Sequence, residues 1–150
     1  MSEDYGSHTR DANRAQLREI ASLLKSASWI ETIAVFPSNR PASIVLFLVT
    51  QQYPQDFVSD VYIEIQSYTN GDFHISYIEN QQGGEWMARW DRHDSEAYTR
   101  DHFHKPPAAR HRDGVDRDFP LELLAMISDV VAPWVYNRIG AVWDTVAGNS

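Results

Sequence analysis

Side chains that can carry acid–base or metal chemistry are concentrated in one segment, residues 89–112, which reads RWDRHDSEAYTRDHFHKPPAARHR. Four of the chain's six histidines lie there, namely His93, His102, His104 and His111, with six of its thirteen Lys and Arg residues. An imidazole with an ordinary pKa of about 6.5 can give or take a proton near neutral pH, and its neutral form can bind a metal. The segment is therefore the first candidate for a functional site.

The spacing of His102 and His104 suits acid–base chemistry on a phosphate. In an extended segment, residues two positions apart point to the same side. Cleavage of RNA needs one group to take the 2′-OH proton and another to protonate the leaving 5′ oxygen, and histidine suits both tasks. Neighbouring cations would stabilise the charge on the phosphate. The candidates for that role are Arg89, Arg92, Lys105, Arg110 and Arg112.

Two other interpretations of the segment stay open. The His102–His104 pair could hold a metal, with His93, His111 or Asp91 completing the shell. No cysteine is present, so a metal would have only His, Asp and Glu as ligands. Because no ligand spacing here is diagnostic, we expect no cofactor and no stoichiometric transition metal. The third interpretation is a solvated surface loop without chemistry.

The pattern before this segment predicts an antiparallel sheet. Residues 61–68 alternate, with Val61, Ile63 and Ile65 on one face, and Asn70–Gly71 is a strong hairpin turn signal. Residues 42–50 form a continuous apolar run, which is typical of a buried strand. We expect about five strands in a mostly antiparallel meander, at residues 29–37, 42–50, 61–68, 72–79 and 85–91.

Helices are predicted on either side of the sheet. Apolar residues at helical spacing indicate a helix from Asp11, the expected N-cap, to about Ala27. A long C-terminal helix is expected from Phe119, capped by Asp118 and bent or divided at Pro133. Between sheet and helix, residues 92–118 lose periodicity and predict a long His/Arg-rich loop. Residues 1–10 are expected to be a disordered tail, and 11–150 a single α+β domain.

Composition limits the classes of function. A net charge of −8 and a pI near 5.1 disfavour nonspecific binding to nucleic acid. Residues 89–117 hold seven cations and six acids, a balance of +1, so the other residues carry −9. Eleven Arg against two Lys, on an acidic chain, resembles the composition of halophilic archaeal proteins. No apolar run is long enough to span a membrane and the N-terminus is polar, which indicates a cytoplasmic protein.

The same segment resembles the TumE family of toxins from bacterial and archaeal toxin–antitoxin pairs. The resemblance rests on Arg89-Trp90-Asp91 near the end of a strand, His93, and His102-Phe103-His104-Lys105 before a C-terminal helix. The family usually has paired histidines after R-W-D, where this chain has only His93. The resemblance implies a small α+β toxin, inhibited by a cognate antitoxin and acting as an endoribonuclease.

Taken together, these patterns favour a metal-independent endoribonuclease of a toxin–antitoxin pair. His102 and His104 would transfer protons, with His93 beside them, and Asp91 would orient a histidine or hold Arg89. Arg89 and Lys105 would bind the phosphate of an RNA substrate. One alternative is a non-enzymatic module whose Arg/His loop binds a protein or nucleic acid, and another is a metal-dependent hydrolase. Assembly into a homodimer stays open.

Overall fold

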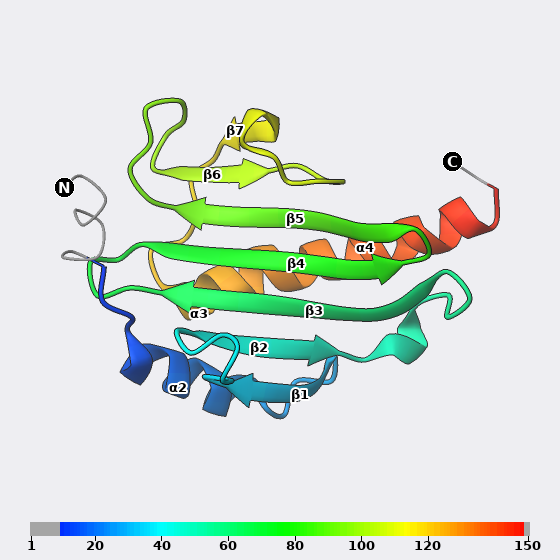
Figure 1. The fold of residues 1–150 in the computed structure, drawn as a ribbon, viewed down its shortest axis with the longest axis horizontal. Coiled ribbons are helices and arrows are strands. Elements are labelled where there is room, and N and C mark those ends of the chain that lie inside the picture. The colour runs from blue at the N-terminus through cyan, green and yellow to red at the C-terminus, as the bar shows by residue number, and fades with distance from the viewer. Residues whose placement is uncertain (1–9, 149–150) are drawn as a thin grey trace.

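A seven-stranded antiparallel sheet dominates the computed structural model, which describes residues 10–148 (Figure 1). The expected disordered tail lies outside the described residues except for Arg10. The strands follow one another across the sheet in chain order, and every neighbouring pair is antiparallel. They are β1 (Ile30–Val35), β2 (Ser43–Leu48), β3 (Val58–Ser67), β4 (Phe73–Gln81), β5 (Gly84–Arg92), β6 (Asp101–His104) and β7 (Gly114–Asp116).

The meander is confirmed, but it has two strands more than the expected five. Strands β1 to β5 lie where the sequence predicts them, whereas β6 and β7 fall inside the segment expected to be a loop. Both are short, and β6 reads DHFH, so neither offers a hydrophobic run or a long alternation. They become strands because β6 pairs with the edge of β5 and β7 pairs with β6.

The N-terminal helix is shorter than expected and is capped by a different residue. Helix α2 spans Arg14–Leu24, and the Asn13 side chain accepts a hydrogen bond from the backbone N–H of Gln16 at 3.1 Å. The N-cap is therefore Asn13 and not Asp11. A side-chain oxygen at this position satisfies one of the free N–H groups of the first turn, which is why the helix begins there.

The C-terminal helix also starts later than Phe119. It comprises α3 (Leu123–Met126), a π-helical stretch (Ile127–Val131) and α4 (Ala132–Val146). The guanidinium of Arg92 donates to the backbone carbonyls of Phe119, Pro120 and Leu121, which holds this segment outside the helix. The π-helical stretch ends two residues before Pro133, which lacks an N–H, so the regular α-helix is interrupted in the expected region.

Both helical segments cover the same face of the sheet. Leu17 of α2 and Val135 of α4 belong to one buried cluster with the inward residues of the strands, such as Ile63. In Figure 1, α3 and α4 run behind strands β3 to β5. The opposite face of β4, β5 and β6 is consequently free of these helices and carries polar side chains.

A buried ion pair fastens α4 to the sheet. Arg138 donates to both carboxylate oxygens of Glu79 at 2.6 and 2.8 Å, and its guanidinium lies 3.4 Å from the centre of the Trp86 ring. Glu79 is completely buried and also accepts from the Tyr77 hydroxyl at 2.6 Å. The pair fixes the position of the helix relative to β4 and β5.

Candidate functional site

The register of β4, β5 and β6 brings the polar residues together. Asp91 lies opposite His74 on one side and opposite His102 on the other, and Arg89 lies opposite His104. These residues share the face of the sheet that points away from α4, because their neighbours Trp90 and Phe103 point into the core. We call the resulting group the imidazole site; it consists of His74, Arg89, Asp91, His93, His102 and His104.

Asp91 lies at the centre of the imidazole site. Its side chain is only 2% exposed, and the Arg89 Nε donates to its Oδ2 and Oδ1 at 2.9 and 3.2 Å. The Nε2 atoms of three histidines lie close to the same Oδ2: His104 at 3.2 Å, and His93 and His102 at 3.7 Å. One carboxylate oxygen is thus shared by an arginine and three imidazoles.

Backbone carbonyls fix the orientation of these three imidazoles. The Nδ1 of His102 lies 2.9 Å from the Thr99 carbonyl, and the Nδ1 of His104 lies 2.9 Å from the Arg110 carbonyl. The Nδ1 of His93 lies 2.8 Å from the carbonyl of Asp94. A carbonyl only accepts, so each Nδ1 carries a proton. In the neutral ring each Nε2 is then an unprotonated lone pair near Asp91.

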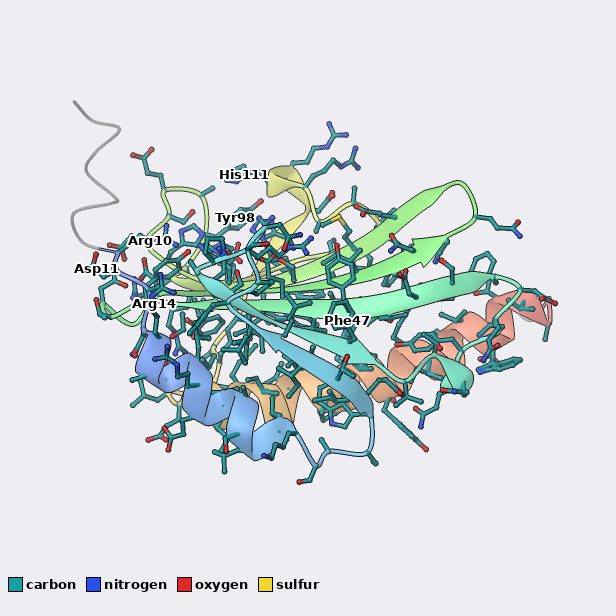
Figure 2. All side chains as sticks on the ribbon, turned by 60° about the horizontal axis from the view of Figure 1, so that its bottom comes forward. Arg10, Asp11, Arg14, Phe47, Tyr98 and His111 are labelled. Atoms are coloured by element: carbon teal, nitrogen blue, oxygen red, sulfur yellow. The ribbon has the colours of Figure 1, made fainter. Side chains whose placement is uncertain are left out.

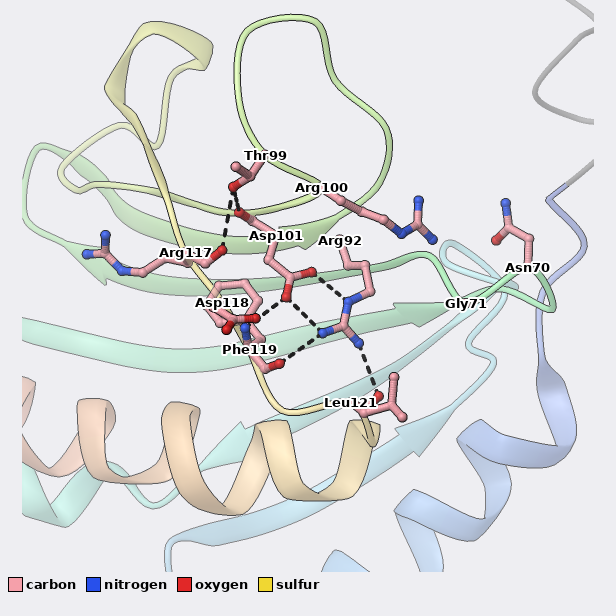
Figure 3. A pocket seen from close by; sticks show the side chains of 10 residues that line it. All are labelled: Asn70, Gly71, Arg92, Thr99, Arg100, Asp101, Arg117, Asp118, Phe119 and Leu121. Atoms are coloured by element: carbon pink, nitrogen blue, oxygen red, sulfur yellow. Dashed lines mark hydrogen bonds and ion pairs between the residues drawn. The ribbon is translucent and has the colours of Figure 1, made fainter.

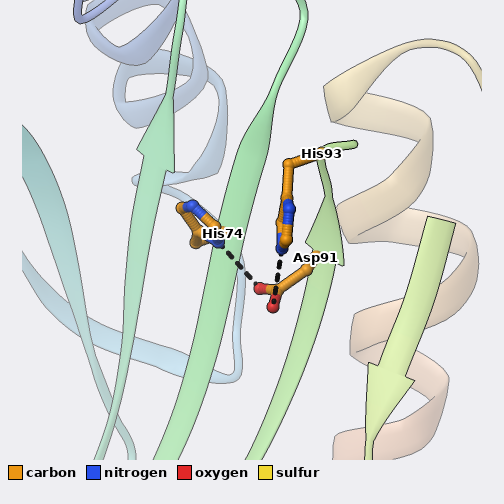
Figure 4. A group of neighbouring side chains, drawn as sticks. All are labelled: His74, Asp91 and His93. Carbon is orange, nitrogen blue, oxygen red and sulfur yellow. Dashed lines mark hydrogen bonds and ion pairs between the residues drawn. The ribbon is translucent and has the colours of Figure 1, made fainter. Parts of the chain in front are cut away.

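His74 contacts Asp91 through the opposite nitrogen (Figure 4). Its Nε2 lies 2.6 Å from the Arg10 guanidinium, which can only donate, so its Nδ1 holds the proton. That Nδ1 donates to Asp91 Oδ1 at 2.9 Å. Both nitrogens of His74 are therefore engaged, and this residue positions the carboxylate.

Tyr98 covers the site from the segment between β5 and β6. Its ring stacks on His102, with centroids 5.3 Å apart and planes 25° apart, and meets His104 edge-on at 5.9 Å. Its hydroxyl donates to the His111 carbonyl at 2.6 Å. Figure 2 shows Tyr98 and His111 on the side of the sheet opposite to the helices. A side chain at Gly114 would collide with the Tyr98 ring, since a Cβ there would lie 2.4 Å from it.

The surroundings of His93 and His104 shift the pKa values of the two imidazoles in opposite directions. Burial alone would raise the pKa of Asp91, but the hydrogen bond from His74, the nearby His93 imidazole and the charge of Arg89 hold that pKa well below its ordinary range. The Asp91 carboxylate raises the pKa of His93, whereas burial lowers the pKa of His104. Near neutral pH, His93 is thus the better proton donor and His104 the better acceptor.

The cationic side chains predicted to contact phosphate differ in their exposure and in their contacts. The Arg89 side chain is 32% exposed, and its described contacts within residues 10–148 involve Nε alone. Lys105, Arg110 and Arg112 are exposed and follow β6, although Arg110 also pairs with Asp113 at 3.1 Å.

Arg92, the fifth candidate for contacting phosphate, donates its hydrogen bonds to other parts of the protein. Its guanidinium donates to Asp101 at 2.6 and 2.9 Å and to the carbonyls described above, and its side chain is 12% exposed (Figure 3). It borders a hollow of about 830 Å³ that contains no histidine among the described residues of its wall. The contacts of Arg92 join β5, β6 and the approach to α3, so its position is that of a structural residue.

The sequence alone does not identify His74 and Tyr98 as residues of the site. The alternation of residues 72–79 already places His74 on the outward face of its strand, which is the face of Asp91 once the hairpin register is known. Nothing in the polar segment 93–100 distinguishes Tyr98 in advance, because its contacts depend on how the loop folds back over β6 and β7.

Comparison with protein families decides the classification. Residues 20–136 match the family described as toxin TumE. The chain belongs to the TumE toxin family. The match covers most of the chain and includes every residue of the imidazole site. No curated protein and no solved structure matches the chain at a significant level.

Membership of the TumE family places the chain among the toxins of toxin–antitoxin systems, which implies an antitoxin partner. Within residues 10–148 no helix has the length and apolar character needed to cross a membrane.

Proposed function

We propose that this TumE-family toxin is an endoribonuclease and that the imidazole site cleaves RNA by proton transfer between histidines. The observation that carries the proposal is the convergence of the His93, His102 and His104 Nε2 atoms on Asp91 Oδ2, at 3.7, 3.7 and 3.2 Å. Imidazoles held at such distances can divide the acid and base roles that phosphodiester transfer needs. The protein would act in the cytoplasm, as its polar N-terminus predicts.

In this proposal His104 is the general base and His93 the general acid. His104 has a lowered pKa and is neutral near pH 7, while His93 has a raised pKa and is the better donor. His102 lies between them, with ring centroids 4.7 Å from His93 and 5.0 Å from His104, and takes part in passing the proton. Asp91 stabilises the imidazolium that forms.

The proposed reaction conserves atoms and protons. His104 takes the proton of the 2′-OH, and the 2′ oxygen attacks the adjacent phosphorus. The new O2′–P bond forms as the P–O5′ bond breaks, and His93 protonates the departing 5′ oxygen. The products are a 2′,3′-cyclic phosphate and a 5′-hydroxyl, with no water consumed in this step.

Charge on the phosphate would be stabilised by Arg89, helped by Lys105, Arg110 and Arg112. The Nε of Arg89 donates to Asp91, and its side chain is 32% exposed, so its terminal nitrogens would be available to a phosphate. Because His104 is 2% exposed under Tyr98, RNA reaches its Nε2 only when the Tyr98 ring moves aside. The antitoxin would neutralise the toxin most simply by covering this face.

The test combines RNA cleavage by purified protein with growth inhibition in cells that lack the antitoxin. His102→Ala and His104→Ala should each abolish both activities, while His111→Ala, which removes an exposed imidazole nearby, should retain them. Assays belong at both low and molar salt, since the composition indicates a halophilic source. Variants that stay folded by circular dichroism and cleave like the parent would overturn the proposal. Protein that inhibits growth without cutting RNA would favour a binding module instead.

A further inference from the structure

The lone pairs at the imidazole site are arranged as metal ligands are. The Nδ1 protons of His102 and His104 go to backbone carbonyls, so in the neutral rings both Nε2 lone pairs face the carboxylate of Asp91. Acceptors facing one another repel unless a proton or a cation lies between them. Metal-bound histidines characteristically donate their other N–H to a carbonyl or carboxylate, which fixes the ring and its tautomer.

Distances within this group match those between ligands of one metal ion. Two atoms bonded at about 2.1 Å in a tetrahedral arrangement lie about 3.4 Å apart. The His104 and His102 Nε2 atoms lie 3.2 and 3.7 Å from Asp91 Oδ2. The ligand atoms of Asp91, His102 and His104 all lie within 4.8 Å of one another, and all three residues are buried.

The surrounding residues support the carboxylate as a ligand. Asp91 Oδ1 accepts from the Nδ1–H of His74, which Arg10 fixes from its other side. Asp91 Oδ2 accepts from the Arg89 Nε at 2.9 Å and is the oxygen that faces the imidazoles. His74 itself is a poor ligand because both of its nitrogens are engaged. A second possible group, His74 with Asp91 and His93, is therefore less suited to a metal than Asp91 with His102 and His104.

We propose that Asp91, His102 and His104 form a binding site for one divalent transition-metal ion of the Zn²⁺ class. Two imidazoles and one carboxylate suit zinc, cobalt, iron or manganese, and they do not suit Ca²⁺ or Mg²⁺, which prefer oxygen ligands. This differs from the expectation drawn from sequence spacing, because the ligands come together through the pairing of β5 and β6.

Metal binding and proton transfer would compete for the same Nε2 atoms. A zinc ion on His104 occupies the lone pair that would accept the 2′-OH proton, so zinc should inhibit RNA cleavage. This consequence rests on the proposed function, whereas binding itself does not. The site would then make the toxin responsive to free transition metal.

The experiment titrates untagged, metal-free protein with Zn²⁺ by calorimetry and with Co²⁺ by visible absorption. One equivalent of Zn²⁺ should bind, and Co²⁺ should give absorption bands typical of nitrogen and oxygen ligands. His102→Ala and His104→Ala should each weaken Zn²⁺ binding more than about a hundredfold, since losing a ligand exceeds the effect of losing an outer partner. His111→Ala should bind like the parent. If an alanine variant is unfolded, the glutamine variant at the same position, His102→Gln or His104→Gln, is measured in its place.

Two results would overturn the metal site: no uptake of Zn²⁺ or Co²⁺ by the parent, or uptake that His102 and His104 substitutions leave unchanged. Cleavage is measured in parallel so that the two proposals fail separately. No RNA cleavage with or without Zn²⁺ would overturn the proposed function and leave the binding result standing. Cleavage that requires Zn²⁺ would support the site and overturn the assignment of His104 as a base.

Discussion

The His104 Nε2 lies 3.2 Å from the Asp91 Oδ2, and both side chains are only 2% exposed. This contact lies between β5 and β6 and places an imidazole with a lowered pKa against a carboxylate whose pKa His74, His93 and Arg89 hold low despite its burial. Strand β6 adds to the sheet through its pairing with β5, and that pairing brings the two side chains together.

Asp91→Asn keeps the size of this side chain and removes its charge. RNA cleavage should fall by about a hundredfold or more, because the imidazolium formed during proton transfer loses its partner. The free energy of unfolding should fall by about 1–3 kcal/mol, since hydrogen bonds to a charged group are lost. Urea denaturation and a single-turnover cleavage assay measure the two effects. Asp94→Asn, at a side chain that is 97% exposed, is the control and should change neither.

Gly114→Ala should displace Tyr98 from His102, because its Cβ would lie 2.4 Å from the ring. The expected loss is about 1–3 kcal/mol of folding stability, the usual effect of forcing an extra methyl group into a packed site. Adding Tyr98→Ala should recover most of that loss. Gly140→Ala, whose added Cβ would meet none of the described residues within 4 Å outside its own helical turn, should instead be neutral or slightly stabilising. RNA cleavage should persist in Gly114→Ala, since the imidazoles are uncovered and not removed.

Arg138→Leu should be among the most destabilising single changes. It leaves the completely buried carboxylate of Glu79 without its partner, which typically costs about 3–5 kcal/mol. The double variant Glu79→Leu with Arg138→Leu should lose less than the sum of the two single changes. Thermal denaturation of the parent, Glu79→Leu, Arg138→Leu and the double variant gives the four stabilities that this comparison needs. Strictly additive losses would show that the pair does not couple α4 to the sheet.

Arg92→Met should impair folding and leave RNA affinity nearly unchanged, in contrast to Arg89→Met. Arg92 donates to Asp101 and to carbonyls before α3, whereas the contacts of Arg89 within residues 10–148 involve its Nε alone. Denaturation and filter binding to single-stranded RNA separate the two roles. Equal losses of RNA affinity in both variants would place Arg92 at the substrate.

The destabilisation caused by Arg92→Met should depend on pH. Burial raises the pKa of Asp101, but the Arg92 and Phe119 hydrogen bonds outweigh this and lower it below the ordinary value. A carboxyl with a lowered folded pKa contributes stability above its unfolded pKa of about 3.9, and that contribution is lost as pH falls through the folded pKa. The stability gap between parent and variant should thus be widest near neutral pH and shrink below about pH 4. A gap that widens in acid would contradict the role of this pair.

The sequence predicts the first five strands because each has an apolar run or a clear alternation between turn signals. It also predicts that His102 and His104 share a side, which the extended β6 shows. The partner of Asp91 on β4 could not be predicted, because the NQQGG turn allows more than one register. The structure pairs Gln81 with Gly84, so Gln82 and Gly83 form the turn and His74 falls opposite Asp91.

The covering of the site depends on contacts that no local pattern reveals. The carbonyls of Thr99 and Arg110 hold the imidazoles through backbone atoms, which any residue type could supply. Tyr98 reaches His102 only because Gly114 leaves room for its ring on β7. Strand β6 likewise owes its existence to β5, so the loop predicted from polarity is in part a sheet edge.

The most direct measurement of the central claim is the chemistry of the cut ends, determined with a single-stranded RNA substrate in the presence of a chelator. Proton transfer between imidazoles predicts fragments that end in a 2′,3′-cyclic phosphate and begin with a 5′-hydroxyl. It also predicts no cleavage where a 2′-deoxynucleotide precedes the scissile bond, and no cleavage by His104→Ala. Fragments with 5′-phosphate ends, or equal cleavage of the 2′-deoxy substrate, would contradict attack by the 2′-OH and with it the role given to the imidazole site.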